Sequence, residues 1–420
     1  MTDIRPFRAL RYDTRKVELA RVLAPVYDIV APEERGLYWE RDPHNALRLE
    51  LTRRVEEEAE TDYADAAARL AEWRRAGVLV RDAEPGLYVL RQSFAAPDGR
   101  PLARTAFFGA LRLEDYARRI VRPHERTLAG PKADRLKILR ATRTNLSSVL
   151  LLYEDRASEL EPLLEAALAS PEAVEACDDA GITQRLAPLR DARGVATVRR
   201  FLSARPVVIA DGHHRYETGL AYRDEARAAG ARDPEAPHER LLACFANAFA
   251  PGSLLLPIHR LVRKGPPPGE AVWRRLAGWQ RREVPLESAE ALPAALEKHL
   301  APLADRHAFA ADDGGGGLAI FSRAADGELT VRVLHRDVLG GLLGLDDAAV
   351  RDGAVDFPKS ALQTARDVRN GRGALALYLN ALRPDDVFRV TERGEVLPQK
   401  STFFHPKLPT GLLFRALEAE

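Results

Sequence analysis

The stretch ARPVVIADGHHRYETGLAYRDEARAAG, residues 204–230, decides the fold that this sequence predicts. Residues 204–210 form a short apolar run, which is typical of a buried strand. Residues 216–230 have the pattern of a helix that ends at Gly230. A tight loop therefore joins a buried strand to the start of a helix. Such a loop directs backbone N–H groups and the positive end of the helix dipole at one point, which suits a phosphate group.

The loop itself carries Asp211, Gly212, His213, His214 and Arg215. Glycine lets the backbone approach an anion closely, and the arginine can hold that anion with two hydrogen bonds. The structural alternative is that Asp211 caps the helix beside two partly buried histidines. Three ionisable groups in succession are a costly way to cap a helix after a buried strand, which favours the phosphate site.

Strand and helix patterns alternate along most of the chain. Residues 87–94 and 104–113 predict a hairpin, because Asp98-Gly99 between them is a strong turn signal. Further strands are expected at 43–51, 147–153, 204–210 and 241–249, and helices within 62–79, 135–145, 157–169 and 216–230. This alternation predicts an α/β (α+β) fold of mixed sheets with flanking helices.

The segment GPPPG, residues 265–269, is the clearest linker in the chain. Residues 1–264 would then form a core α/β region that contains the HERT and DGHHR motifs. Residues 265–355 would form a variable and less regular α+β region. Residues 356–420 contain a helix, a strand and a loop, and we expect this C-terminal segment to return to the site.

A second charged segment, RPHERT at 122–127, is followed by Lys132. Glu125 lies in sequence beside Arg122, Arg126 and Lys132, and these cations would keep its carboxylate ionised. Such a carboxylate can take a proton from a hydroxyl group or hold a metal ion. The alternative is a solvated charged loop with Asp134 capping the helix that follows.

A third candidate segment near the C-terminus contains Lys400, Ser401, Thr402 and Lys407. Lysine is scarce in this chain, since only eight of its 63 basic residues are lysines. A lysine kept against that bias indicates a need for a compact positive charge, which arginine does not supply. No Gly-x-x-x-x-Gly precedes Lys400, so the segment is not a Walker A motif. A phosphate contact of another kind stays open.

The composition of the chain excludes several classes of protein and of partner. The chain has 420 residues with a formal net charge of +1, so charge argues for a small-molecule partner rather than nucleic acid. Two cysteines cannot form a disulfide framework, which fits a cytoplasmic location. The start of the chain lacks the pattern of a signal peptide, and no apolar run approaches the roughly 20 residues of a membrane span.

A metal site is the competing use of the histidines. His124, Glu125, His213 and His214 are candidate ligands, but none has the spacing of an HExxH motif. Mg²⁺ that accompanies a nucleotide is the better prediction, with Glu125 and Asp211 as its carboxylate ligands.

Several motifs resemble one known family along nearly the whole chain. They are RPFRALRY at 5–12, APVYDIV at 24–30, DPHNALRLEL at 42–51, PHERT with PKADR at 123–135, ADGHHRYET at 210–218, LPIHR at 256–260 and QKSTFFHPKLPTG at 399–411. In this order they resemble the family called domain of unknown function 1015. The sequence departs from the family in APVYD, where APPYD is usual, and residues 265–355 match no motif.

The strand-DGHHR-helix unit is also similar to the GxxR-type box of the ParB/sulfiredoxin-like superfamily, which includes free serine kinases. That resemblance implies a ParB/sulfiredoxin-like core in which the loop holds nucleotide phosphates. The loop lacks the cysteine of sulfiredoxins, and the net charge argues against a DNA-binding partition protein. The resemblance therefore implies a phosphotransferase that uses ATP or ADP with Mg²⁺ on a small hydroxyl compound, with serine or phosphoserine as first candidates, in the kinase or the phosphatase direction.

The leading hypothesis assigns Glu125, Asp211 and His213 to catalysis, with both carboxylates as metal ligands. The residues assigned to phosphate or nucleotide binding are Gly212, His214, Arg215, Arg126, Lys132, Lys400, Ser401, Thr402 and Lys407. Segments 122–135, 210–217 and 398–407 are expected to converge on one pocket, because a polyphosphate needs several cations together. Two alternatives stay open: a non-catalytic nucleotide-binding regulator of ParB-like type and a metal-dependent hydrolase.

Overall fold

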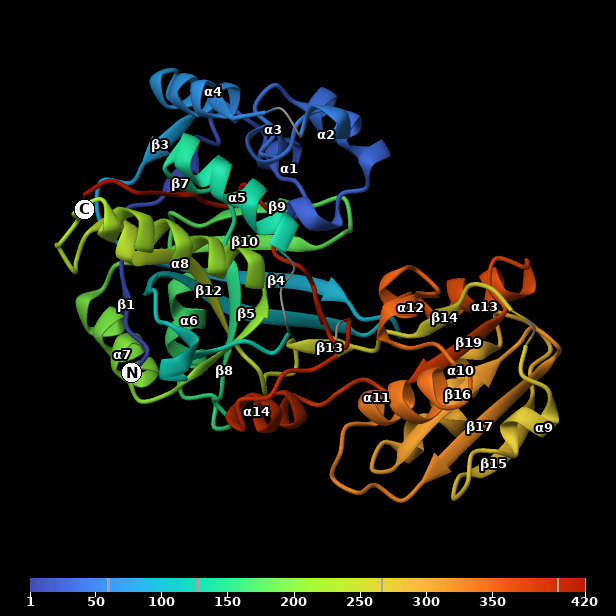
Figure 1. Ribbon diagram of the computed structural model, residues 1–420. Helices are drawn as coiled ribbons and strands as arrows, with labels where there is room; N and C mark the ends of the chain where they lie inside the picture. The colour runs from blue at the N-terminus through green and yellow to red at the C-terminus, as the bar shows by residue number, and fades with distance from the viewer. Residues whose placement is uncertain (59–60, 126–128, 266, 399, 420) are drawn as a thin grey trace. The chain divides into compact units, whose positions relative to one another are not determined.

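The computed structural model describes residues 1–58, 61–125, 129–265, 267–398 and 400–419; of residues 129–131 and 347 it describes the backbone (Figure 1). Contacts divide the chain into two compact units. The first unit contains Met1–Leu254, Thr391–Val396 and Pro406–Glu420, and the second contains Leu255–Val390 and Leu397–His405. The second unit begins at Leu255, ten residues before the predicted boundary after residue 264. No boundary between the units lies at the predicted position after residue 355.

The first unit is built around a nine-stranded sheet with the order β6-β11-β8-β12-β5-β4-β10-β9, and β1 adds to β5. The strands are β1 (Ile4–Arg5), β4 (Leu87–Ala95), β5 (Pro101–Arg112), β6 (Val121–Arg122), β8 (Val149–Tyr153), β9 (Val174–Cys177), β10 (Thr183–Leu189), β11 (Val207–Asp211) and β12 (Arg240–Asn247). β11 is parallel to β6 and β12 is parallel to β8, whereas β4 and β5 form the predicted antiparallel hairpin. The mixed sheet confirms the predicted α/β (α+β) class.

Apolar side chains of the sheet pack with those of α6 (Glu161–Leu168) and α7 (Ala192–Ser203) to form the main core of the first unit. The rings of Phe107 and Phe245 stack at 5.2 Å between centroids, and Phe201 of α7 meets Tyr153 edge-on at 5.8 Å. Each fully buried aromatic ring contributes about 2–3 kcal/mol from burial. This core fixes the central strands, from whose ends the candidate site is built.

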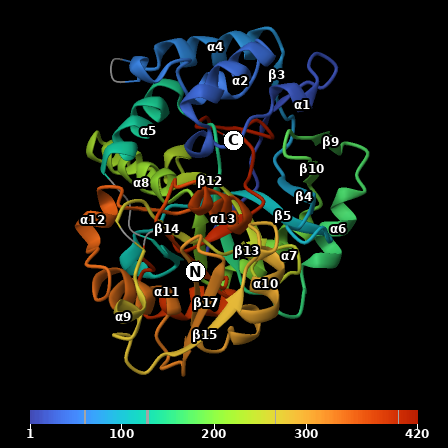
Figure 2. The ribbon, with the colours of Figure 1, turned by 90° about the vertical axis from the view of Figure 1, so that its right-hand side faces the viewer.

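On the sheet, α8 (His213–Ala228) follows β11 directly and packs beside α5 (Ala129–Thr142), as Figures 1 and 2 both show. Tyr216 anchors α8, because its hydroxyl donates to the Glu114 carbonyl at 2.8 Å and accepts from the Glu114 N–H at 3.0 Å. Gly219 allows close packing, since a Cβ there would lie 3.3 Å from Leu113 and Leu241. The strand-loop-helix unit predicted at 204–230 is thus confirmed.

The predicted strand at 43–51 is wrong, because the structure has a short helix, α3 (Leu47–Glu50), in this segment. The Asn45 side chain donates to the carbonyls of Arg21 and Leu23 at 2.8 and 3.1 Å, and its Oδ1 accepts from the Leu47 N–H at 3.0 Å. These bonds start a helical turn where the alternating pattern predicts an extended chain.

Smaller elements complete the first unit. They are β2 (Leu10–Tyr12), α1 (Leu19–Val22), η1 (Tyr27–Ile29), η2 (Pro32–Glu34), α2 (Arg35–Arg41), η3 (Val55–Glu57), α4 (Ala64–Arg75), β3 (Leu79–Arg81), η4 (Tyr116–Arg118), β7 (Thr144–Asn145), η5 (Pro237–Glu239) and β21 (Arg415–Ala416). β21 pairs with β7, so the C-terminal segment is attached to this unit.

The second unit contains a six-stranded sheet with the order β15-β17-β16-β19-β14-β18, in which all neighbouring strands are antiparallel. The strands are β14 (Arg260–Val262), β15 (Gln280–Pro285), β16 (His307–Asp312), β17 (Gly317–Arg323), β18 (Val355–Asp356) and β19 (Leu375–Leu379), with β13 (Leu254–Leu256) paired to β20 (Phe403–His405). Its helices are α9 (Glu270–Trp273), α10 (Leu292–His299), η6 (Ala301–Leu303), α11 (Thr330–Val333), the π-helix η7 (Leu334–Gly340), α12 (Asp347–Arg351) and α13 (Ala361–Arg369). α14 (Pro384–Glu392) spans the boundary at Val390. In the described residues, no helix is both long and apolar enough to cross a membrane.

Candidate functional site

The turn between β11 and α8 has a conformation that requires glycine. Gly212 has a φ of 88°, which is the left-handed region, and it stands at the N-cap of α8. A Cβ at this position would lie 2.9 Å from Cζ and Nε of Arg215. The guanidinium therefore packs directly over the bare backbone of the turn. A side chain here would strain the turn and displace the arginine.

Asp211 lies between two cations at the end of β11. Its Oδ2 accepts from Nη2 of Arg215 at 2.7 Å, and its Oδ1 accepts from the ammonium of Lys407. Burial alone would raise the pKa of Asp211, but Lys407 and Arg215 outweigh burial and hold the pKa well below its ordinary value. The carboxylate is therefore ionised at neutral pH and is engaged through both oxygens.

Arg215 is buried, and its guanidinium is largely used within the protein. Besides Asp211, it donates through Nη1 to the carbonyl of Ser148, and its Nε is buried with no hydrogen-bond partner. The side chain is 8% exposed, so it does not present a free guanidinium to an anion from solvent. In this arrangement Arg215 orients Asp211 and ties α8 to the chain next to β8.

Two buried histidines lie next to this pair. Nε2 of His213 accepts from the backbone N–H of His124 at 3.3 Å, and the two rings meet edge-on at 4.6 Å. Nδ1 of His124 faces the carbonyl of Ile209, so this nitrogen carries the proton. Burial lowers the pKa of His124 to about 4 and lowers that of His213 well below its ordinary value. Both imidazoles are therefore neutral at pH 7.

The outer part of the site contains His214, Glu217 and Lys132. Nζ of Lys132 on α5 lies 2.7 Å from Oε2 of Glu217 on α8, and the lysine side chain is 35% exposed. Partial burial lowers the pKa of His214, while the nearby carboxylates of Glu217 and Asp28 oppose that shift. This pair leaves Lys132 accessible to a ligand at the first turn of α8.

Lys407 is held in place by two polar residues in the sheet. Arg104 of β5 is 2% exposed and donates to the carbonyl of Pro406 at 2.6 Å, as well as to Oε1 of Gln92 on β4. Nε2 of Gln92 donates to the carbonyl of Lys407 at 3.1 Å. The backbone at 406–407 is therefore fixed by the sheet, which positions the ammonium against Asp211.

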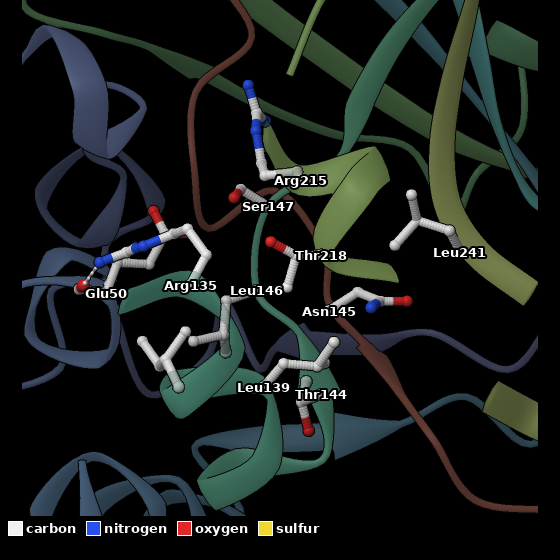
Figure 3. Close-up of a pocket in the computed structure, with 11 residues that line it drawn as sticks. Glu50, Arg135, Leu139, Thr144, Asn145, Leu146, Ser147, Arg215, Thr218 and Leu241 are labelled. Carbon is white, nitrogen blue, oxygen red and sulfur yellow. Dashed lines mark hydrogen bonds between the residues drawn. The ribbon is translucent and has the colours of Figure 1, made fainter. Parts of the chain in front are cut away.

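A cavity of about 50 Å³ lies between α5, α8 and the segment 144–147 (Figure 3). Its lining includes the charged residues Glu50, Arg135 and Arg215, the polar residues Thr144, Asn145, Ser147 and Thr218, and the leucines Leu139, Leu146 and Leu241. Oγ1 of Thr218 is buried with no hydrogen-bond partner, so the cavity has room and donors for bound water. Arg135 is paired with Asp134 at 2.5 Å and stacks over the Tyr27 ring at 4.1 Å.

Five residues near the site are not among the predicted site residues: Tyr27, Glu50, Gln92, Arg104 and Arg135. Tyr27 belongs to the APVYD segment, and the guanidinium of Arg215 lies 5.9 Å from its ring centroid. Burial raises the pKa of Tyr27 to about 12, so its hydroxyl stays protonated. The motif APVYDIV was an available signal for Tyr27, whereas Gln92 and Arg104 stand singly in strands and carry no local signal.

The other predicted residues fall into three groups. Glu125 is half-buried beside His124 in sequence, and its role stays a prediction. Arg126 lies outside the described residues. Lys400, Ser401 and Thr402 belong to the second unit, where the Ser401 hydroxyl donates to the Pro398 carbonyl at 2.6 Å. Of the three predicted segments, the structure thus brings together His124, Lys132, 211–217 and Lys407.

Asp211 does not fit the role of a Mg²⁺ ligand in this arrangement, because Lys407 and Arg215 engage both of its oxygens. Within the described ranges, no group of three or more His, Cys, Asp or Glu side chains is arranged to hold a metal ion. The assignment of Mg²⁺ to Glu125 stays a prediction, whereas the two cations on Asp211 disfavour that residue as a ligand.

The chain is weakly similar to several solved structures and matches one family model. A free serine kinase in complex with AMP has a TM-score of 0.34 and 16% identity, covering 70% of this chain and 89% of that chain. A variant of free serine kinase in complex with ADP has a TM-score of 0.35 and 14% identity over the same shares, 70% and 89%. C-terminally truncated SbnI from Staphylococcus aureus has a TM-score of 0.33 and 10% identity, covering 72% of this chain and 85% of that chain. No curated protein matched. The family model described as protein of unknown function (DUF1015) matches residues 4–304, and the chain belongs to this family.

Proposed function

We propose that this protein is a phosphotransferase that moves a phosphoryl group between a nucleotide and a small hydroxyl compound, with serine or phosphoserine as the first candidate. The observation that carries the proposal is the Asp211–Lys407 pair, in which Asp211 ends β11 two residues before α8 begins. The pair places a compact ammonium beside the N-terminus of a helix, where backbone N–H groups favour an anion.

Phosphoryl transfer needs positive charge around the phosphoryl oxygens and a group that handles the hydroxyl proton. The backbone N–H groups at the start of α8, the His214 ring and Lys132 are the proposed phosphate contacts. Lys407 adds charge when a phosphate oxygen approaches its ammonium from the side away from Asp211. Arg215 acts through Asp211 and the turn, so it is a positioning residue in this proposal.

The hydroxyl proton is assigned to Glu125, which is half-buried three residues after β6. The substrate hydroxyl loses its proton to the carboxylate of Glu125, and the hydroxyl oxygen bonds to the terminal phosphorus of the nucleotide. The bond from that phosphorus to the bridging oxygen breaks. In the reverse direction, the protonated carboxyl group returns the proton to the leaving hydroxyl. His213 stays neutral and offers a hydrogen bond rather than charge.

The proposal is tested by phosphorus NMR of the full chain with ATP, ADP, CTP or pyrophosphate, each with serine and with phosphoserine, in the presence of Mg²⁺. The expected result is transfer of phosphate between one nucleotide or pyrophosphate and one hydroxyl compound. Binding of a nucleotide without consumption would instead indicate the regulatory alternative. Neither binding nor turnover with any pair would contradict the proposal.

Replacing Glu125 by Gln should lower turnover by about 10²-fold or more, because the side chain keeps its size and loses its basic oxygen. Nucleotide affinity should stay close to that of the wild type. Steady-state kinetics and calorimetric titration with the nucleotide measure the two quantities. Glu72→Gln, on the exposed side of α4, is the matched control and should leave both unchanged. Turnover of Glu125→Gln at the wild-type rate would remove Glu125 from the mechanism.

Replacing Lys132 by Met should weaken nucleotide binding by roughly tenfold, as expected when a charged hydrogen bond to phosphate is lost. The fold should survive, because the pair with Glu217 is partly exposed. Lys298→Met, on the exposed side of α10, removes the same charge elsewhere in the chain. Equal affinities of the two variants in calorimetric titration would show that Lys132 does not contact the nucleotide.

A further inference from the structure

Arg260, the first residue of β14 in the second unit, is a buried cation without a buried acid. The side chain is among the largest in the protein that are fully buried, at 0% exposure. It donates through Nε to Nε2 of His335 at 3.1 Å and through Nη1 to the carbonyl of Ile258 at 2.5 Å. Nη2 is buried with no hydrogen-bond partner. Among the described residues, no carboxylate forms an ion pair with this guanidinium.

The groups around Arg260 do not compensate its charge. Burial lowers the pKa of the guanidinium to about 9, so Arg260 is still charged at pH 7. Burial and the charge of Arg260 lower the pKa values of His259 and His335 to about 4, so both rings are neutral. A buried charge with no partner costs several kcal/mol. Such an arrangement is stable only when the rest of the unit offsets that cost.

The residues over Arg260 suggest how an anion would reach it. His335 belongs to the π-helix η7, and π-helices are rare and concentrate at functional sites. The ring of Phe357 lies 5.2 Å from Cζ of Arg260. Both His335 and Phe357 are half-buried, so single side chains separate the guanidinium from the surface. The exposed Lys359 follows two residues after Phe357 and adds positive charge to this side of the second unit.

We propose that Arg260 is the recognition residue of a phosphate-binding site in the second unit, separate from the site at α8. The phosphate group displaces the ring of Phe357 or His335, accepts hydrogen bonds from Nη2 and supplies the missing negative charge. Free inorganic phosphate and the phosphate of a larger ligand share this chemistry. The proposal does not depend on the proposed phosphotransfer reaction, since every residue named here lies in the second unit.

The test is thermal unfolding of the full chain in phosphate-free buffer and with millimolar inorganic phosphate, at constant ionic strength. Phosphate should raise the Tm of the wild type by about 2 °C or more, because it binds only the folded state. Arg260→Met should raise the Tm in phosphate-free buffer, since it removes an unpaired buried charge, and should lose the part of the phosphate response that Arg260 supplies; any response that remains belongs to the site at α8. Arg263→Met is the matched control, because Arg263 is exposed and paired with Asp356; it should keep the response.

Arg260→Gln is the second variant, because it removes the charge and keeps a polar group. It shows whether an effect of Arg260→Met comes from the packing of methionine. If both Arg260 variants unfold below the wild type in phosphate-free buffer, or if either responds to phosphate as strongly as Arg263→Met, the proposal is wrong. AMP in place of phosphate distinguishes the sources: a larger shift with AMP that is lost in Arg260→Met assigns the phosphate to a nucleotide. A shift with AMP that persists in Arg260→Met belongs to the site at α8.

Discussion

Replacing Asp211 by Asn should lower the free energy of unfolding by about 3–5 kcal/mol, the usual loss when one partner is removed from a buried ion pair. The reason is that Lys407 and Arg215 would stay buried without the carboxylate that now engages both. The side chains of Asp211 and Lys407 are each only 18% exposed, so water compensates little of this loss. Urea unfolding followed by circular dichroism measures the effect.

Two further variants show whether the loss comes from the ion pair. Asp98→Asn removes a carboxylate that is 51% exposed and paired with Arg100 in the hairpin loop, and it should cost no more than about 0.5 kcal/mol. The double variant Asp211→Asn with Lys407→Met should regain part of the stability, because one unpaired cation is removed. A loss for Asp211→Asn as small as that for Asp98→Asn would contradict the assigned pair.

Acidification from pH 6.5 to pH 4 should cost the first unit about 3 kcal/mol through His124 alone. The pKa of His124 is about 4 in the folded protein and about 6.5 in the unfolded chain, so the unfolded chain binds more protons between these values. A depressed pKa in the folded state therefore gives stability that is complete above pH 6.5 and is lost as the pH falls toward 4. His213 shifts in the same direction and adds to the slope.

Urea midpoints measured at intervals of pH give this slope directly. His124→Asn keeps a donor for the Ile209 carbonyl and has no titrating ring, so its stability should depend less on pH in this range. His299→Gln in the second unit is the control, because His299 contributes no such buried ring. An unchanged slope in His124→Asn would contradict the neutral, buried state of this histidine.

Local patterns predicted the centre of the fold because their causes are local. The apolar run before Asp211 forms most of β11, and the helix begins at His213, three residues before its predicted start at Tyr216. The hairpin of β4 and β5 follows from Asp98-Gly99 in the same way. The strand prediction for residues 43–51 is wrong because the Asn45 side chain makes hydrogen bonds with Arg21 and Leu23. Hydropathy carries no information about such contacts.

Local pattern predicted the site residues from Asp211 to Arg215, and composition predicted the lysines. The scarcity of lysine indicated Lys132 and Lys407, although the pair with Asp211 joins residues 196 positions apart. The same signal indicated Lys400, which belongs to the other unit. The sequence does not indicate Arg104 or Gln92, because a polar residue in a strand ordinarily faces solvent. In the structure both are buried, at 2% and 0% exposure.

The attachment of Lys407 to the sheet through Gln92 and Arg104 has a consequence for biosynthesis. Chains leave the ribosome from the N-terminus, and domains generally fold as they emerge. Asp211 is synthesised well before Lys407, and the whole second unit is translated between them. The nascent first unit therefore holds Asp211 without its ammonium partner until the second unit has been made. Until then, Asp211 is engaged by Arg215, which follows it by four residues, without the second cation.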